Sequence, residues 1–314
     1  MPVHNGERYV AEAIESVLAQ THRDLELVAI DDGSTDGTWA ILRGFAARDP
    51  RVRAFTQANA DQPATLNRGL ELAGYEWVAI HDHDDVSLPE RLERQLRFLR
   101  DHPAVRVLGT YATEIDAAGR DMGSLPFGPA SMDEFRRTRA GDHLLTPVHP
   151  SVVLHRPTVL ALGGYDPAFG PAADAELWSR VADDHPVLVL PEMLLRYRVH
   201  GGSMSFTRLF HQRQLLRWAC RRQRARRSGL RIPTFVEHLA WERGPLAMRQ
   251  ANLRRLDWAF FASRRARLAM MAGRRLETGL YLGTTIILEP IGTTRRAMAH
   301  AQRTRLPQII CDAK

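Results

Sequence analysis

The strongest constraint in this sequence is a short apolar run that ends in a crowd of acidic side chains. Residues 77–80 are Trp-Val-Ala-Ile, and Asp82, His83, Asp84 and Asp85 follow after one residue. Such a run, bounded by a charged cluster, is typical of a buried strand that delivers carboxylates to the end of a sheet. Because neighbouring carboxylates repel, the cluster predicts a bound hard cation such as Mg²⁺ or Mn²⁺. The alternative is an acidic loop that only caps the next helix.

A second acidic junction favours the cation site over the cap. Residues 25–30 form another strand-like segment, and residues 31–38 continue as Asp-Asp-Gly-Ser-Thr-Asp-Gly-Thr before a helical pattern. Strands that end in carboxylates and lead into helices describe an open α/β sheet. In such a sheet the ligand lies beyond the carboxyl ends of the strands.

Strand and helix patterns alternate along the first two thirds of the chain. Strands are expected near 25–30, 52–56, 77–80, 105–110 and 186–190, and helices near 7–20, 37–48, 62–73, 89–101 and 173–183. This alternation predicts a mostly parallel sheet flanked by helices. Residues 111–150 lack a clean period and contain several glycines and prolines, so we expect a loop-rich excursion there.

Charge separates two regions of the chain. Residues 1–200 contain 20 Arg and 30 acidic residues, whereas residues 201–314 contain 22 Arg, one Lys and six acidic residues. The asymmetry predicts a catalytic domain over residues 1–205 and a basic helical appendage over residues 206–314. We expect no nucleic-acid partner, because no recognised binding module appears and the catalytic region is acidic.

The appendage contains a helical stripe of apolar residues, Leu253, Leu256 and Phe260, beside several arginines. The stripe either packs against the catalytic domain or docks on an anionic membrane surface. We find no signal peptide and no run near the ~18 apolar residues of a spanning helix. We therefore expect a cytoplasmic protein, which would be peripheral at the inner face of the membrane if the stripe docks there.

Seven short motifs, taken in order, resemble the signature of family 2 glycosyltransferases with the GT-A fold. They are Pro2-Val3-His4-Asn5-Gly6-Glu7, Ser16-Val17-Leu18-Ala19-Gln20-Thr21, Asp31-Asp32-Gly33-Ser34-Thr35-Asp36-Gly37-Thr38, Asn67-Arg68-Gly69-Leu70, Asp82-His83-Asp84-Asp85, Gly163-Gly164-Tyr165-Asp166 and Tyr197-Arg198-Val199-His200. The resemblance covers residues 1–205 and implies a GT-A type, Rossmann-like α/β fold.

The resemblance also implies a reaction. It is an inverting transfer of a sugar from a nucleotide-diphosphate donor to an acceptor hydroxyl, with Mn²⁺ or Mg²⁺ as the cofactor. UDP- or dTDP-linked sugars are the first donors to expect, and the acceptor would be a saccharide or a lipid-linked molecule. Polysaccharide, lipopolysaccharide or glycolipid synthesis is the implied setting.

Individual residues acquire roles from the same resemblance. Pro2 and Asp32 map to positions that wrap and contact the nucleobase. Asp82 and Asp84 match the ends of the family's Asp-x-Asp motif, with Asp84 as the direct metal ligand and Asp82 near the ribose or the metal. His83 is the variable position of that motif, so we expect a structural role for it. The mapping agrees with the physical need for a cation beside a leaving diphosphate.

An inverting transfer also requires a base that takes the proton of the acceptor hydroxyl. The family supplies it from a Glu-Asp pair ahead of an Asp-Leu-Trp helix, and the segment here reads Ala173-Asp174-Ala175-Glu176-Leu177-Trp178. Asp174 occupies the base position, and Ala173 replaces the glutamate of the pair. Glu176 is the fallback base, and a helix cap is the alternative role for Asp174.

The last motif supplies two further candidates. Some family members use the histidine of the Tyr-Arg-x-His stretch as a metal ligand, which maps to His200, although a structural histidine is equally open. Arg198 of the same stretch maps to donor binding, because an arginine can pair with a diphosphate.

One part of the family pattern is absent. The family's first strand, a short apolar run before the Pro-x-x-Asn loop, has no counterpart ahead of Pro2. We expect either that translation starts upstream or that the sheet has a vacant place, which would lower stability and activity. Two alternative functions therefore stay open. One is a sugar-nucleotide nucleotidyltransferase, although its glycine-rich phosphate loop is not found, and the other is a truncated, inactive glycosyltransferase-like protein.

Overall fold

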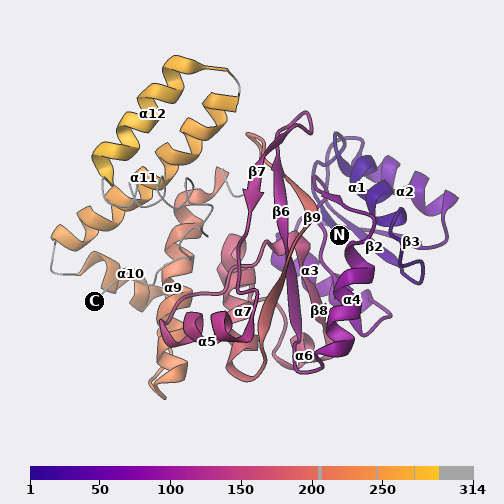
Figure 1. Cartoon of the computed structure of the whole chain (residues 1–314), viewed down its shortest axis with the longest axis horizontal. Helices are drawn as coiled ribbons and strands as arrows, with labels where there is room; N and C mark the ends of the chain where they lie inside the picture. The colour runs from indigo at the N-terminus through magenta and orange to yellow at the C-terminus, as the bar shows by residue number, and fades with distance from the viewer. Residues whose placement is uncertain (204–206, 245–246, 272, 290–314) are drawn as a thin grey trace. The chain divides into compact units, whose positions relative to one another are not determined.

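The structure is a computed structural model that describes residues 1–203, 207–244, 247–271 and 273–289. The chain divides into two compact units. The first comprises Met1–Ser203 and contains all the strands of Figure 1, and the described residues after it form a helical second unit. The division lies close to the boundary expected at residue 205.

The first unit begins with a small parallel sheet. Its strands lie in the order β1, β2, β3, and both pairs are parallel. Apolar residues of α1, including Val10 and Ile14, pack with Ala29 of β2 and Leu42 of α2 in a buried cluster. The elements are β1 (Pro2–Val3), α1 (Val10–Leu18), β2 (Leu27–Asp32), α2 (Thr38–Arg48), β3 (Val52–Gln57) and α3 (Gln62–Leu72).

A second, mixed sheet follows, with the strand order β4, β8, β6, β9, β5 and with β7 paired to β6. Only β6 and β9 pair in parallel, so the expected parallel arrangement describes the first sheet and not the second. Its elements are β4 (Trp77–Ala79), β5 (Val86–Ser87), α4 (Arg91–Asp101), β6 (Val107–Ile115), β7 (Asp121–Leu125), α5 (Met132–Ala140), η1 (His149–Ser151), β8 (Val153–His155), α6 (Arg156–Ala161), η2 (Pro167–Ala172), α7 (Ala173–Asp184) and β9 (Val187–Arg198).

The expectation of a loop-rich excursion over residues 111–150 was wrong for much of that segment. It contains the end of β6, the strand β7 and the helix α5. Gly119, at φ 79°, forms part of the turn between β6 and β7. Ser131 caps α5 by accepting a 3.2 Å hydrogen bond from the Glu134 amide. The glycines and prolines therefore separate short strands and helices, which a search for long periodic runs does not detect.

The place of the expected first strand holds only the two-residue β1. Pro2 and Val3 pair with Ile30 and Asp31 of β2, and β1 ends the sheet at that edge. Among the described residues, no strand bridges β2 and β4. A cavity of about 370 Å³ lies there, lined mainly by apolar side chains from both strands. The Met1 ammonium lies beside it and donates to the Val28 carbonyl at 2.9 Å, and burial lowers the pKa of this amine to about 6.

A side-chain clamp joins α3 to the glycine pair that precedes Tyr165. The Asn67 amide donates to the Tyr165 carbonyl and accepts from the Tyr165 amide, both at 2.8 Å. A Cβ atom on Gly164 would lie 2.4 Å from Asn67 Oδ1, and Gly164 has φ 70°. Close approach and a left-handed backbone therefore both require glycine at this position.

Replacing Gly164 with Ala should destabilise the protein more than the matched change Gly163→Ala. Gly163 also has a positive φ, 85°, but a Cβ added there would have no atom within 4 Å. We expect a loss of about 1 kcal/mol for Gly163→Ala from the left-handed backbone alone and about 3 kcal/mol for Gly164→Ala. Urea unfolding measures both losses. Equal losses would show that Asn67 moves aside at no cost.

The second unit consists of helices whose packing includes buried ion pairs. Arg217 of α9 pairs with Glu242 of α10 at 2.6 Å and with Asp257 of α11 at 2.9 Å, and Arg213 also pairs with Asp257. Among the described residues, no helix is both long and apolar enough to cross a membrane. The helices are α9 (Leu209–Arg227), α10 (Phe235–Arg243), α11 (Ala247–Met271) and α12 (Arg275–Leu288).

Candidate functional site

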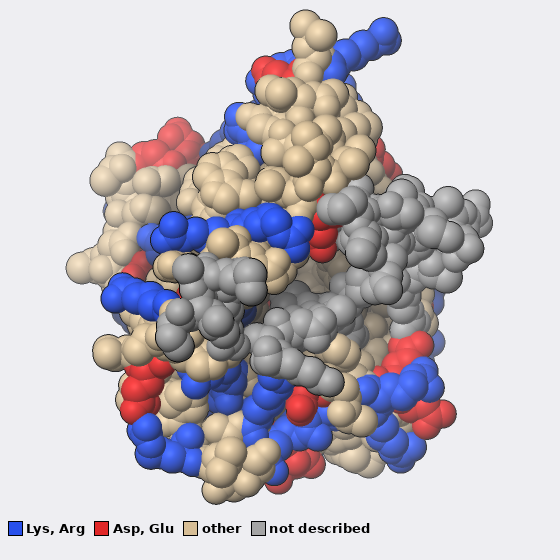
Figure 2. Space-filling view, turned by 90° about the vertical axis from the view of Figure 1, so that its left-hand side faces the viewer, with Lys and Arg blue, Asp and Glu red and all other residues tan. Residues whose placement is uncertain are grey.

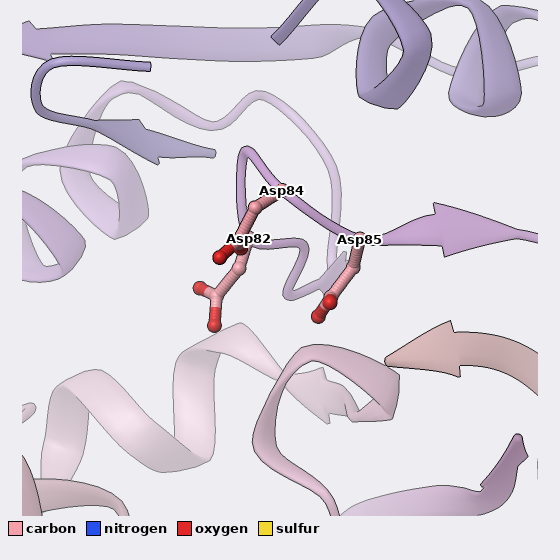
Figure 3. Close-up of side chains that lie close together, drawn as sticks. All are labelled: Asp82, Asp84 and Asp85. Atoms are coloured by element: carbon pink, nitrogen blue, oxygen red, sulfur yellow. The ribbon is translucent and has the colours of Figure 1, made fainter. Parts of the chain in front are cut away.

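Three carboxylates meet in the loop between β4 and β5. Asp82, Asp84 and Asp85 each place one oxygen within 4.8 Å of the others, and their side chains project from one loop (Figure 3). Ile80 and His81 lead from β4 into this loop, and β5 anchors its far end by pairing with β9. Three converging carboxylate oxygens match the ligand chemistry of a hard divalent cation.

Asp85 has the least solvated carboxylate of the three. Only 1% of this residue is exposed, and its Oδ1 accepts a 2.7 Å hydrogen bond from the Arg198 amide. Burial and the charges of Asp84 and Asp82 raise the pKa of Asp85 well above its ordinary value. Its Oδ2 is buried without a hydrogen-bond partner. A buried oxygen of this kind is a fitting position for a cation, or for a ligand of one.

The structure brings the two predicted metal ligands together. His200, just after β9, places its Nε2 3.0 Å from Oδ2 of Asp84. Burial alone would raise the pKa of Asp84, but its hydrogen bond with His200 and the charge of His83 bring it below the ordinary value. Asp84 is therefore held as a carboxylate, which is the form that binds a metal.

Arg198 lies in this region, but protein atoms already engage its guanidinium. The residue is 3% exposed, and its Nη2 pairs with Glu12 at 2.7 Å. Nε donates to the Asp84 carbonyl at 2.7 Å, and Nη1 donates to the Asp116 carbonyl at 3.3 Å. These contacts favour a role in positioning the acidic loop over the predicted contact with a diphosphate.

The two predicted nucleobase residues lie at neighbouring strands of the first sheet. Asp32, at the end of β2, accepts hydrogen bonds from the Gln57 side chain at 2.7 Å and the Ala60 amide at 2.9 Å. Pro2 lies in β1 and is buried. His83 hydrogen-bonds with the backbone of Pro2, and a Cβ on Gly6 would lie 2.6 Å from the His83 ring. These contacts agree with the expected structural role of His83.

Asp174, the predicted base, lies in the first turn of α7 and is half-buried. Burial raises the pKa of Asp174 to about 6, against the opposing effect of the backbone amides at its own helix start. Asp174 also contributes to the raised pKa of Asp82, about 6, after burial and Asp84. The two carboxylates therefore lie close enough to interact.

The fallback base is in a different environment. Glu176 is fully buried, and its Oε2 pairs with Arg180 at 2.8 Å. Arg180 also donates to the carbonyls of Leu162 and Gly164, both at 2.6 Å. Glu176 is therefore part of the interior packing between α7 and the loop after α6. The geometry favours Asp174 over Glu176 as the group that a substrate could reach.

Sequence reasoning missed a half-buried histidine beside Asp82. His149 of η1 lies 3.0 Å from the Tyr165 hydroxyl, and its ring lies near Trp178. Burial lowers the pKa of His149, and the charge of Asp82 opposes that effect. A lone histidine in a segment without clear periodicity gave no signal for this contact, which joins elements far apart in sequence.

Arg91 was also missed. It is 1% exposed, and its Nη2 donates to the Ile80 carbonyl at 3.0 Å, directly before the acidic loop. Burial lowers the pKa of Arg91 to about 9. The signal was present in the sequence: Arg91 shares one face of α4 with Gln95 and Leu99, and all three are buried.

The first unit is similar in sequence to a known protein family. The profile described as "Glycosyl transferase family 2" matches residues 1–160, which is just over half of the chain. The chain belongs to this family. The membership confirms the resemblance carried by the motifs in the first unit.

Two curated relatives differ in how much of each chain the similarity covers. "Putative glycosyltransferase EpsE" of Bacillus subtilis (strain 168) is 40% identical over 121 residues, which cover 38% of this chain and 44% of the relative. "O-antigen biosynthesis glycosyltransferase WbnJ" of Escherichia coli is 29% identical over 207 residues, which cover 65% of this chain and 79% of the relative. The matches span less than half of four of the first five relatives, between 33% and 45% of their lengths.

A solved structure supports the fold. The mannosyltransferase PcManGT from Pyrobaculum calidifontis, in complex with GDP-Man and Mn²⁺, has a TM-score of 0.55 at 19% identity. The similarity covers 96% of this chain and 86% of that chain. Together with the family match, it confirms the predicted GT-A type α/β fold.

Replacing Asp84 with Asn should weaken Mn²⁺ binding by at least about tenfold, because the change removes a ligand charge where three carboxylates converge. His200→Ala should weaken binding in the same direction. Isothermal titration of Mn²⁺ in the presence of UDP measures both effects. Asp133→Asn, at an exposed side chain far along the sequence from the loop, is the matched control. Unchanged affinity in Asp84→Asn would contradict the site.

Proposed function

We propose that this chain is a metal-dependent, inverting glycosyltransferase that moves a sugar from a nucleotide-diphosphate donor to an acceptor hydroxyl. One observation carries the proposal. Three carboxylates and His200 meet in the β4–β5 loop, and Asp174, a carboxylate whose pKa is raised to about 6, lies within electrostatic reach of Asp82. A cation site beside a separate base is the arrangement that such a transfer requires.

The acidic loop would hold the metal. Asp84 and His200 are the proposed direct ligands, and the unpartnered Oδ2 of Asp85 is a further candidate. A bound Mn²⁺ or Mg²⁺ would neutralise the negative charge that develops on the leaving nucleoside diphosphate. Asp82 would lie near the ribose or the metal. Arg198 would position the acidic loop. Its guanidinium donates to the Asp84 carbonyl, and its backbone amide donates to the Asp85 carboxylate.

Asp32 and Pro2 would form the nucleotide end of the site. Pro2 starts the short strand β1, which pairs with the end of β2, and Asp32 is the last residue of β2. Asp32 also holds the β3–α3 connection by accepting from the Ala60 amide at 2.9 Å. Backbone and side-chain groups at strand ends are where an open α/β sheet binds its ligand. The GDP-Man complex of the structural neighbour supports a nucleotide-sugar donor here, and UDP or dTDP sugars are the first to test.

Asp174 would act as the base. Its carboxylate would accept the proton of the acceptor hydroxyl while that oxygen attacks the anomeric carbon and the diphosphate leaves from the opposite face. A pKa near 6 suits this task at neutral pH, because the group is mostly ionised yet more basic than an ordinary aspartate. The name of the relative WbnJ supports a saccharide acceptor in cell-surface polysaccharide synthesis.

The deciding experiment is a thermal-shift panel of nucleoside diphosphates with and without Mn²⁺. We expect UDP or a related diphosphate to raise the melting temperature only with the metal, because a ligand that binds the folded state stabilises it by mass action. Asp84→Asn should abolish the metal-dependent part of the shift. Equal shifts in EDTA would contradict the metal role. Release of pyrophosphate from a nucleoside triphosphate and a sugar phosphate would support a nucleotidyltransferase instead.

Asp174→Asn should retain metal-dependent donor binding but lose about 10² to 10⁴ in transfer rate, because only the base is removed. For the parent protein, kcat/KM should fall as pH drops below about 6, where Asp174 becomes protonated. Initial rates of nucleoside diphosphate release measure both effects. The matched control is Asp133→Asn, which should follow the parent's profile. A rate for Asp174→Asn within threefold of the parent would assign the base role elsewhere.

A further inference from the structure

The helix α12 exposes several large apolar side chains to solvent. Leu276, Leu280 and Ile287 are 92%, 66% and 81% exposed. At spacings of four and seven residues they share one face. Ile286, 53% exposed, lies at the edge of that face, and Leu282, 46% exposed, lies nearer to the side of Thr285.

The opposite face of α12 is the polar one. Thr285 is 2% exposed there, and its hydroxyl donates to the Tyr281 carbonyl at 2.8 Å. The Tyr281 ring lies 5.4 Å from the Arg265 guanidinium of α11, the helix against which α12 packs. The usual burial pattern of an amphipathic helix is therefore inverted: Thr285 is the buried residue, and Leu276, Leu280 and Ile287 are exposed. A contiguous exposed apolar face of this kind marks an interaction surface.

We call the residues Leu276, Leu280, Ile286 and Ile287 the α12 face. Figure 2 shows a broad uncharged surface, drawn tan, with blue and red side chains beside it. Arg274 and Arg275 are exposed where α12 begins, and Arg255 donates to the Leu288 carbonyl where α12 ends. Arginines therefore flank an apolar centre.

Two partners could cover this apolar face, a second copy of the chain or a lipid surface. The positive charge of residues 201–314 decides between them. A second copy of this chain would bring the same arginines together, in a region with 22 Arg and six acidic residues over 201–314. An anionic lipid surface offers the opposite charge at its phosphates and an apolar layer just beneath them. Arginine side chains can extend to those phosphates while neighbouring aliphatic side chains enter the apolar layer.

We propose that the α12 face docks on the surface of an anionic lipid bilayer, with the helix lying in the plane of the interface. At 14 residues, α12 is about 21 Å long, which suits a helix lying on the surface and not one that spans the bilayer. The surface differs from the stripe that the sequence suggested. Leu253 lines a cavity among α9, α10 and α11, and Leu256 is half-buried. The proposal does not depend on sugar transfer.

Vesicle co-sedimentation of the full chain tests the proposal. The vesicles are phosphatidylcholine alone, or phosphatidylcholine with about a third phosphatidylglycerol. We expect binding to the anionic vesicles that falls severalfold between about 0.05 M and about 0.5 M NaCl, because salt screens surface attraction. The triple variant Leu276→Asn, Leu280→Asn, Ile287→Asn should bind at least about tenfold more weakly, since it removes the exposed apolar area. Val236→Asn with Leu230→Asn, at positions 74% and 67% exposed outside α12, should bind like the parent.

Hydrogen exchange of the parent protein provides a test without substitutions. Anionic vesicles should slow exchange in peptides from α12 and leave α10 unchanged. Absence of binding to anionic vesicles, or equal binding by the triple variant, would overturn the proposal. A combination of two results would also overturn it: a dimer in light scattering that the triple variant abolishes, and hydrogen exchange of α12 that vesicles leave unchanged. The α12 face would then bind a second copy of the chain.

Discussion

Repulsion among the carboxylates of the β4–β5 loop is the constraint that the surrounding structure accommodates. Asp82, Asp84 and Asp85 place oxygens within 4.8 Å of one another, and like charges this close disfavour the ionised form. The protein supplies compensation from two segments, the end of β9 and the start of α4. Arg198 and His200, at the end of β9, contact Asp84 and Asp85, and Arg91 of α4 fixes the carbonyl before the loop. The residual charge supports the proposed cation site.

Several motif residues contact other protein groups and so support the shape of the site. Arg198 is engaged by the loop backbone and Glu12, and His83 and Gly6 pack together at the first turn. Asn67 and Gly164 likewise hold the segment that carries Tyr165, beside His149. A short motif in this family can therefore mark a residue that shapes the site without touching a substrate. This distinction leaves Asp84, His200 and Asp174 as the residues to which we propose to assign the chemistry.

The two units follow different packing rules. The first buries an apolar core between helices and sheets and places its charge at strand ends. In the second, ion pairs of Arg213 and Arg217 lie between helices, and the apolar face of α12 lies outside. An outward apolar face is stable only against a partner or a lipid surface. The proposed sugar transfer and the proposed lipid docking therefore rest on separate parts of the chain.

The sequence by itself determined the α/β class, most helix positions of the first unit and the family, because periodicity and short motifs are local properties. It also identified Asp82, Asp84, His200 and Asp174 as candidates. Only the tertiary structure decided which of them meet, since Asp84 and His200 are 116 residues apart in sequence. Burial likewise raised the pKa of Asp174, paired Glu176 with Arg180 and turned the aliphatic face of α12 outward. Solvent exposure depends on what packs against a residue, and the residue's own neighbours in sequence do not specify that.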